Sequence, residues 1–233
     1  MNVLQIAARI SATCVESKTR HKDPGNKFDL SEFKSLPGRE GSFSPLLKYA
    51  NDRLKFIGGG SARAVFILSS SKVLKIAYGL HLEPGLSQNK AEVDFYTNPK
   101  TKQVCAKIFD FDPNYEWLIS ELVKPVNESE FKKLTGVNPW DFRDFGKSLG
   151  DGLSPEEVYE QYLDDNEMQN IKSIPKKMFD KWIYVLENIL DQGVLIGDLT
   201  KPDSWGVTSS GNLVILDYGI NKEVKRKHYR SDF

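Results

Sequence analysis

The stretch that most constrains this chain is residues 196–219, IGDLTKPDSWGVTSSGNLVILDYG, where two aspartates flank a hairpin signal. Asp198 precedes a polar loop, and Asp217 directly follows the apolar run at residues 213–216. A glycine-containing turn between β-branched apolar runs is the usual mark of a β-hairpin. Because a hairpin folds the chain back on itself, we expect the two aspartates to converge although they are distant in sequence.

Two carboxylates that share a cleft repel each other unless a positive group joins them. A divalent cation that also binds phosphate oxygens is the usual partner, because hard cations prefer oxygen ligands. The stretch therefore predicts a magnesium site that binds a phosphate-bearing ligand. These residues alone leave one alternative open, in which the two carboxylates simply cap the ends of strands.

The composition is that of an ordinary globular protein, with 39% hydrophobic and 27% charged residues among 233. Thirty-two basic residues balance thirty-two acidic ones, so we expect neither a nucleic-acid nor a membrane partner. Two cysteines, Cys14 and Cys105, are too few for a disulfide framework or a zinc set, and we expect buried, reduced thiols. No apolar run approaches the roughly 18 residues of a membrane span, and no signal peptide is evident, which predicts a cytoplasmic location.

Residues 1–50 are predicted to form a helix followed by an irregular extension. Apolar residues recur at helical spacing over residues 2–18, and this face is expected to pack on the same chain or, alternatively, in a homodimer. Residues 19–42 are polar and contain two prolines and several glycines, which predicts an irregular connection. Ser44 and Pro45 then predict the start of a short helix.

Residues 54–68 read as a strand, a glycine turn and a second strand. Gly58, Gly59 and Gly60 lack a Cβ, so their main-chain N–H groups can approach phosphate oxygens closely. A strand rather than a helix follows the turn, which disfavours a dinucleotide-binding βαβ unit. Taken alone the glycines are a weak signal, and an ordinary hairpin turn is the alternative.

Further strands are predicted at residues 72–77, 104–111 and 116–123, and a helix at residues 88–96. From residue 127 the hydrophobic period changes from 2 to 3.6. Helices are predicted at residues 127–135, 139–149, 154–170 and 175–192. The basic run at residues 222–227 is predicted to be a solvated tail, with a contact to an acidic partner as the alternative.

In this order the features resemble the protein-kinase-like superfamily. GDLTKPDSWG followed by LDYG is similar to the catalytic loop H-R-D-L-x-x-x-x-N and the D-F-G motif, and residues 58–65 are similar to G-x-G-x-x-G-x-V. The match covers residues 54–219. In its compact form the chain is similar to small kinase-like proteins of bacteriophages. It implies an α+β, bilobal fold, with a five-stranded antiparallel N-lobe and one αC-like helix at residues 51–126, and a reduced, mainly helical C-lobe at residues 127–233.

The resemblance also implies roles for individual residues. Asp198 takes the place of the catalytic base, and Lys75 takes that of the phosphate-binding lysine, which pairs with Glu92. Asp217 and Asp203 take the places of the two Mg²⁺ ligands, and Ser120 that of the gatekeeper. The remaining ATP contacts implied are Gly58, Gly59, Gly60, Ser61, Val65, Glu121 and Val123.

Four positions depart from the family pattern. Arg63 replaces the third glycine, which either stiffens the loop or adds a contact to phosphate. Ile196 and Gly197 precede Asp198 in place of His-Arg, and the glycine is closer to the H-G-D of aminoglycoside and choline kinases. Asp203 replaces the usual asparagine, and a third carboxylate favours a metal-filled site over an empty one.

The resemblance implies an ATP- and Mg²⁺-dependent phosphotransferase that acts on a protein Ser/Thr hydroxyl. A small-molecule kinase of the aminoglycoside or choline kinase type is one alternative, suggested by Gly197 and by the few residues that follow Gly219. A catalytically inactive pseudokinase that binds a protein is the other, suggested by Arg63, by the same short C-lobe and by the additional helix predicted at the amino terminus. If the chain is encoded by a phage, the partner is expected to be a host protein in the host cytoplasm.

Overall fold

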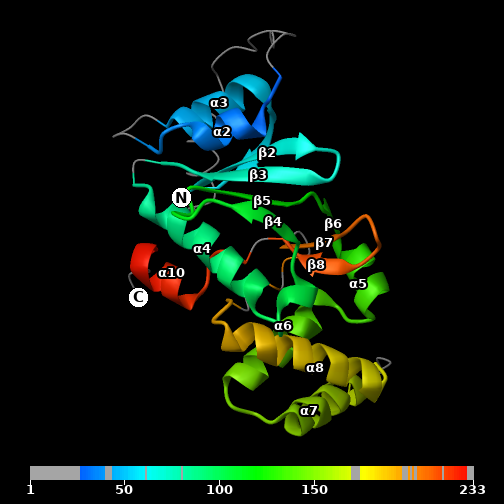
Figure 1. The fold of residues 1–233 in the computed structure, drawn as a ribbon. Helices are drawn as coiled ribbons and strands as arrows, with labels where there is room; N and C mark the ends of the chain where they lie inside the picture. Colours follow the sequence, from blue (N-terminus) through cyan, green and yellow to red (C-terminus); the bar gives the residue numbers. More distant parts are fainter. Residues whose placement is uncertain are drawn as a thin grey trace, which may run out of the picture. The chain divides into compact units, whose positions relative to one another are not determined.

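The computed structural model describes residues 27–39, 44–60, 62–79, 81–168, 174–195, 199, 201, 204–216 and 218–229 (Figure 1). The chain divides into two compact units. The sheet unit comprises Met1–Asn89 and Ile108–Leu122, and the helical unit comprises Lys90–Lys107 and Val123–Phe233. The helix predicted over residues 2–18 lies outside the described residues. No helix in the described part of the chain is both long and apolar enough for a membrane span.

The sheet unit is built on a five-stranded antiparallel sheet, as predicted. Its strands occur in the order β1-β2-β3-β5-β4, and every neighbouring pair is antiparallel. The strands are β1 Lys55–Gly59, β2 Arg63–Ser69, β3 Lys72–Ala77, β4 Ile108–Phe111 and β5 Trp117–Glu121. β4 is shorter than predicted because the chain before it forms a 3-10 turn, η1 Lys102–Val104.

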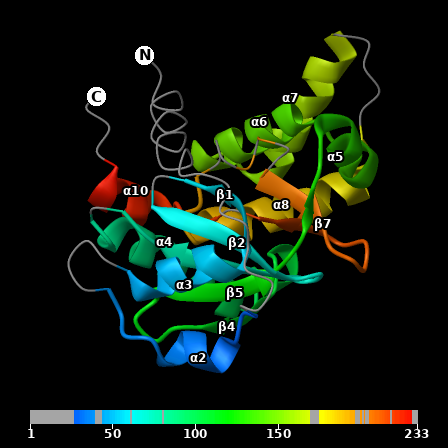
Figure 2. The same ribbon diagram turned by 90° about the horizontal axis from the view of Figure 1, so that it is seen from above.

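Two helices, α2 Leu30–Ser35 and α3 Pro45–Arg53, cover one face of this sheet (Figures 1 and 2). The prediction of an irregular connection over residues 19–42 was wrong at α2. A six-residue helix is too short to show a hydrophobic period, and it depends on capping and packing for stability. The Asp29 side chain caps it by accepting hydrogen bonds from the N–H groups of Ser31 at 2.7 Å and Glu32 at 3.0 Å.

The predicted helix start at Ser44 and Pro45 is confirmed in α3. The Ser44 hydroxyl accepts a hydrogen bond from the Leu47 N–H at 3.2 Å, and Pro45 occupies the first helical position.

Phe33 is the centre of the core between these helices and the sheet. Its ring lies edge-on to that of Trp117 on β5 at 5.7 Å and tilted to that of Tyr49 on α3 at 6.2 Å. Phe66, Leu74 and Ile76 complete the same buried cluster from β2 and β3. Because strand residues alternate between faces, this cluster leaves the odd-numbered residues of β3 for the other face.

Helix α4, Glu83–Thr97, is continuous across the division between the units, which falls between Asn89 and Lys90. Residues 90–107 group with the helical unit, whereas the sequence placed them in the N-lobe. The physical reason is that Phe95 and Cys105 are buried in the helical unit's core. The order of strands and helices in the chain otherwise matches the protein-kinase-like arrangement that the resemblance implies.

The helical unit contains the four predicted helices, α5 Glu128–Thr135, α6 Pro139–Gly150, α7 Pro155–Met168 and α8 Lys176–Asp191. It also contains a three-stranded antiparallel sheet in the order β6-β7-β8, with strands β6 Lys124–Pro125, β7 Trp205–Val207 and β8 Leu213–Ile215. The predicted hairpin is therefore confirmed as β7 and β8. Gly211 has φ +84° in its turn, a conformation that favours glycine.

Aromatic side chains form the centre of the helical unit. The ring of Trp205 lies edge-on to those of Phe131 and Phe142, each at 5.5 Å, and to that of Trp182 at 6.4 Å. The Trp182 indole N–H donates a hydrogen bond to the Thr135 carbonyl at 3.0 Å. These contacts fix α5, α6, α8 and the β7–β8 hairpin in one packed cluster.

The basic side chains of residues 222–227 are exposed, as predicted for a solvated run, but the run is helical. It forms helix α10, Lys222–His228, capped by the Asn221 side chain, which accepts a hydrogen bond from the Val224 N–H at 2.9 Å. Val224 is buried, and the basic side chains of the last turn complement the helix dipole.

Replacement of Phe33 by alanine tests whether α2 belongs to the core. Phe33→Ala is expected to lower the free energy of unfolding by about 3–5 kcal/mol, the usual cost of truncating a buried phenylalanine. Urea denaturation followed by circular dichroism measures the change. The matched control is Phe109→Ala, because Phe109 on the edge strand β4 is 40% exposed and should cost less than about 1 kcal/mol. Equal effects of the two substitutions would show that α2 is not part of the cooperative core.

Candidate functional site

The glycine turn connects β1 to β2. Gly58 and Gly59 pair with Val65 and Ala64 across the hairpin, and the Gly60 N–H donates to the Arg63 carbonyl at 3.0 Å. The tip of the turn is anchored from the end of β3. Tyr78 donates its hydroxyl to the Gly60 carbonyl at 2.6 Å and its N–H to the Ala62 carbonyl at 2.8 Å. Ser61, a predicted nucleotide contact, lies outside the described residues.

The fold itself does not require glycine at two positions of this turn. A Cβ added to Gly58 or Gly60 would meet no other atom within 4 Å, and neither residue has a positive φ. The space beside the backbone is therefore open at both positions. An open, side-chain-free turn is what phosphate oxygens need in order to reach main-chain N–H groups.

Lys75 lies in the middle of β3 and is only 9% exposed. It is opposite Val65 on β2 and Leu118 on β5. Since residues directly opposite each other share a face, these three side chains lie on the face that α2 and α3 do not cover. A lysine is almost never buried to this degree unless it is paired, so its position on this face is set by specific surroundings. Lys75 stays a predicted site residue.

Arg63, the residue in the place of the third glycine, is buried and engages helix α4. Its Nη1 donates to Asn89 Oδ1 at 3.5 Å, and Asn89 Nδ2 donates to the Tyr115 carbonyl at 2.8 Å. Asn89 is fully buried, and Tyr115 has φ +61° in the turn between β4 and β5. Of the two roles considered for Arg63, the contacts favour stiffening of the loop.

Asn89 is a residue that sequence reasoning missed. It joins the start of β2, the β4–β5 turn and helix α4, and it lies three residues before Glu92. No local pattern indicates this role, because the partners come from segments distant in sequence. Glu92 itself is buried on α4. It belongs to the helical unit and Lys75 to the sheet unit, so the pairing of the two stays a prediction.

The predicted hinge follows β5. The division between the units falls between Leu122 and Val123, at this segment. The Leu122 N–H donates to the Ser71 carbonyl at 2.9 Å, and Glu121 pairs with Lys72 at the end of the sheet. In the helical unit Val123 is buried in a small cluster with Val214.

Ser120, which the resemblance puts at the gatekeeper position, is buried on β5. The adenine contacts implied for Glu121 and Val123 stay predictions.

The three predicted aspartates, Asp198, Asp203 and Asp217, lie outside the described residues, but a chain neighbour of each is described. The Trp205 indole N–H donates to the Leu199 carbonyl at 2.7 Å, and the Leu216 N–H donates to the Ser204 carbonyl at 2.8 Å. Because Ser204 and Trp205 are consecutive, the residues beside all three aspartates belong to one hydrogen-bonded set. Among the described residues no cluster of three His, Cys, Asp or Glu side chains could hold a metal, so the metal assignment stays a prediction.

Tyr218, the residue after Asp217, is a second one that sequence reasoning did not single out. Its ring lies 4.8 Å from that of Phe95 on α4, and its hydroxyl donates to the Ala106 carbonyl at 3.4 Å. Phe95 follows Glu92 by about one helical turn. The residue beside Asp217 therefore packs on the helix that carries Glu92. The aromatic residue in the LDYG motif was the sequence feature that could have indicated this packing.

Cys105, close to Tyr218, is a buried free thiol as predicted. The pKa of this thiol is raised to about 12, mainly by burial. The hydrogen bond with Tyr218 lowers the pKa, whereas the negative charge of Glu92 raises it further. At neutral pH the thiol is protonated, which makes it a poor nucleophile. Cysteine-based catalysis at this position is therefore disfavoured.

No family model matches this chain, and no curated protein sequence matches it. Solved structures that are similar include choline kinase LicA from Streptococcus pneumoniae, at 13% identity over 87% of this chain and 79% of that one, with a TM-score of 0.34. An ADP-bound aminoglycoside phosphotransferase, APH(2'')-Ib, is similar at 13% identity over 72% of this chain and 65% of that one, with a TM-score of 0.33.

WbdD is similar at 13% identity over 76% of this chain, with a TM-score of 0.36, and the chain spans only 33% of its length. Likenesses this distant assign no activity to the chain.

Removal of the Asn89 side chain tests the buried network around Arg63. Asn89→Ala is expected to lower the free energy of unfolding by about 1–3 kcal/mol, because it leaves the Tyr115 carbonyl without its donor and removes an acceptor from Arg63. Urea denaturation measures the loss. Asn114→Ala, at an exposed position of the β4–β5 turn, is the control and should be close to neutral. Wild-type stability of Asn89→Ala would mean that the network contributes nothing.

Proposed function

We propose that this protein is a phosphotransferase that transfers the terminal phosphoryl group of ATP, with Mg²⁺, to a hydroxyl group, with a protein Ser/Thr hydroxyl as the first candidate acceptor. The single observation that carries the proposal is the hydrogen-bonded set formed by Leu199, Ser204, Trp205 and Leu216. It gathers the chain neighbours of Asp198, Asp203 and Asp217. In the proposal the three aspartates gather beside these neighbours, which is the arrangement that a metal–phosphate site requires.

The sheet unit fits the nucleotide at two points. The turn at Gly58 and Gly60 offers open backbone with no side chain in the way, and Lys75 offers a buried positive charge on the same sheet. In the proposal Lys75 binds the phosphates, Glu92 orients Lys75, and Val65 contacts the adenine. The main chain at Glu121 and Val123 binds the adenine edge by hydrogen bonds.

The acidic residues complete the chemistry. Asp217 and Asp203 would hold Mg²⁺, which neutralises phosphate charge when bound. Asp198 orients the acceptor hydroxyl and accepts its proton. Phosphoryl transfer depends mainly on positioning and charge neutralisation, and a lysine with three aspartates supplies both.

Alanine at Gly60 separates phosphate binding from folding. Because the fold leaves open space there, Gly60→Ala is expected to keep the wild-type unfolding midpoint while it weakens ATP binding by about tenfold, through a Cβ between backbone and phosphate. Isothermal titration calorimetry with ATP and Mg²⁺ measures the affinity. The control is Gly150→Ala in the helical unit, another position with open space, which should leave ATP affinity unchanged. Unchanged affinity in Gly60→Ala would place the phosphates elsewhere.

Substitution of the buried lysine tests catalysis directly. Lys75→Met is expected to lower kcat/KM for ATP by at least about 100-fold, because it removes a charge that stabilises the transferring phosphoryl group. Lys72→Met, on the same strand but the other face, is the control and should retain activity. Transfer of radiolabelled phosphate from ATP to acceptor, or its release by hydrolysis, measures the rate, and Asp198→Ala should be inactive.

Should the wild-type protein show no Mg²⁺-dependent stabilisation by ATP in a thermal shift experiment, nucleotide binding itself would be refuted. Stabilisation without any transfer or hydrolysis would instead identify a pseudokinase.

A small-molecule acceptor is the second candidate. The observation that favours it is Gly197 before Asp198, the order that resembles aminoglycoside and choline kinases. Transfer to small alcohols and aminoglycosides, compared with transfer to generic Ser/Thr protein substrates under the same conditions, separates the two classes of acceptor.

A further inference from the structure

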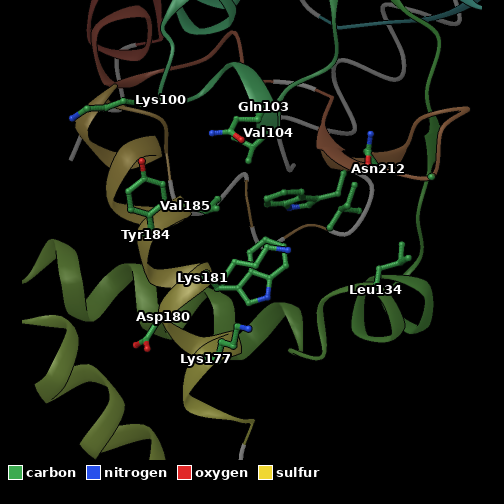
Figure 3. A pocket seen from close by; sticks show the side chains of 14 residues that line it. Lys100, Gln103, Val104, Leu134, Lys177, Asp180, Lys181, Tyr184, Val185 and Asn212 are labelled. Carbon is green, nitrogen blue, oxygen red and sulfur yellow. The ribbon is translucent and has the colours of Figure 1, made fainter.

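A groove of about 690 Å³ lies within the helical unit, apart from the residues proposed to act on ATP (Figure 3). Helix α8 forms one wall, and the chain at Gln103 and Val104 forms another. Leu134 at the end of α5 and Asn212 in the β7–β8 turn close it on the side across from α8. Trp182, Val185 and Trp205 supply an apolar floor.

The rim of the groove is basic, although the chain as a whole has no net charge. Lys100, Lys177 and Lys181 line it, and within the described part of the chain none of them forms an ion pair with a carboxylate. The one acidic lining residue, Asp180, pairs with Lys176, which does not line the groove. Three lysines that form no ion pair among the described residues therefore surround an apolar floor, and one of them, Lys181, also lies 5.2 Å from the centre of the Trp182 ring.

The groove is long enough for a stretch of polypeptide. Lys177 and Val185 both line it and are eight residues apart on α8, which corresponds to about 12 Å along the helix axis. Lys100 lies at the Val185 end and Lys177 at the other (Figure 3). A compact anion would reach the charges at one end only, whereas an extended segment of about four residues spans both.

Two other occupants fit less well. Single-stranded nucleic acid binds by stacking successive bases on several exposed aromatic faces, but of the aromatic residues that line the groove Tyr184 alone is exposed, at 55%, whereas Trp182 is 6% and Trp205 1% exposed. Residues 1–26 of this chain carry more basic than acidic side chains, so their charge does not complement that of the rim. An acidic and aliphatic segment matches both the charge of the rim and the apolar floor.

We propose that this groove is a docking site for a short acidic–aliphatic segment of another protein, with carboxylates at its ends and aliphatic side chains between them. The carboxylates pair with Lys100 at one end and with Lys177 and Lys181 at the other. The aliphatic side chains pack against Val104, Val185 and Leu134. This binding does not depend on the proposed ATP chemistry.

The test uses the full chain and a fluorescein-labelled synthetic peptide of about ten residues, long enough to overlap both ends of the groove, with glutamates at both ends and leucines between them. Fluorescence anisotropy is expected to show saturable binding that weakens at high salt. Lys177→Glu with Lys181→Glu should weaken it at least about tenfold. Lys132→Glu with Lys147→Glu changes the net charge equally at exposed positions outside the groove, and should leave the affinity unchanged.

A third variant, Leu134→Ser, tests the apolar contact at an exposed position where folding should not suffer, and a several-fold weaker affinity is expected. Thermal unfolding of each variant confirms that the fold is intact. Each of the following outcomes would overturn the proposal: no saturable binding of the peptide, equal weakening by both charge reversals, tighter binding of labelled oligo(dT), or equally strong competition by citrate. Light scattering tests for dimerisation of the chain. If dimerisation depends on concentration and Lys177→Glu with Lys181→Glu abolishes it, the groove binds a second copy of this chain instead.

Discussion

The helical unit depends on the placement of one side chain, Trp205. Its indole ring fills the space between Phe131, Phe142 and Trp182, while its N–H donates to the Leu199 carbonyl. A buried tryptophan needs a partner for its N–H, so packing and hydrogen bonding specify one orientation together. That orientation brings the chain beside Asp198 to the first strand of the β7–β8 hairpin, and the hairpin ladder brings Leu216 to Ser204. The hydrogen-bonded grouping of Leu199, Ser204 and Leu216 is thus a consequence of core packing.

The two faces of the five-stranded sheet differ in the residues that they bury. One face buries Phe66, Leu74 and Ile76 under α2 and α3, and these contacts hold the strands in register. The other face carries Lys75, which could not be kept buried on a mobile strand. The hydrogen bond between Arg63 and Asn89 links β2 to α4. A fully satisfied buried network of this kind rigidifies its surroundings. The open glycine turn is therefore held by rigid neighbours on both sides.

The sequence predicted those parts of the fold whose determinants are local. Alternation of apolar residues located β2, β3 and β5, and the Ser44–Pro45 and Ser-Ser-Gly-Asn patterns located a helix start and a hairpin turn. It missed α2 and α10, because helices of six and seven residues are too short to show a period and are stabilised by the burial of Phe33 and Val224. Arg63, Asn89 and Tyr218 could not be assigned partners, because their contacts join segments distant in sequence. Motif spacing predicted Lys75 as a site residue, and the structure adds that this lysine is buried.

Trp205 also lines the basic groove, so one residue contacts both that groove and the segment beside Asp198. A shared residue is not by itself an allosteric connection, because coupling requires an element with two arrangements that the two ligands bind differently. Trp205 is almost wholly buried, and its ring and its N–H are both held. A side chain fixed in this way has no second arrangement of comparable energy. The groove is therefore suited to holding a partner at a fixed place on the helical unit rather than to switching the acidic segment.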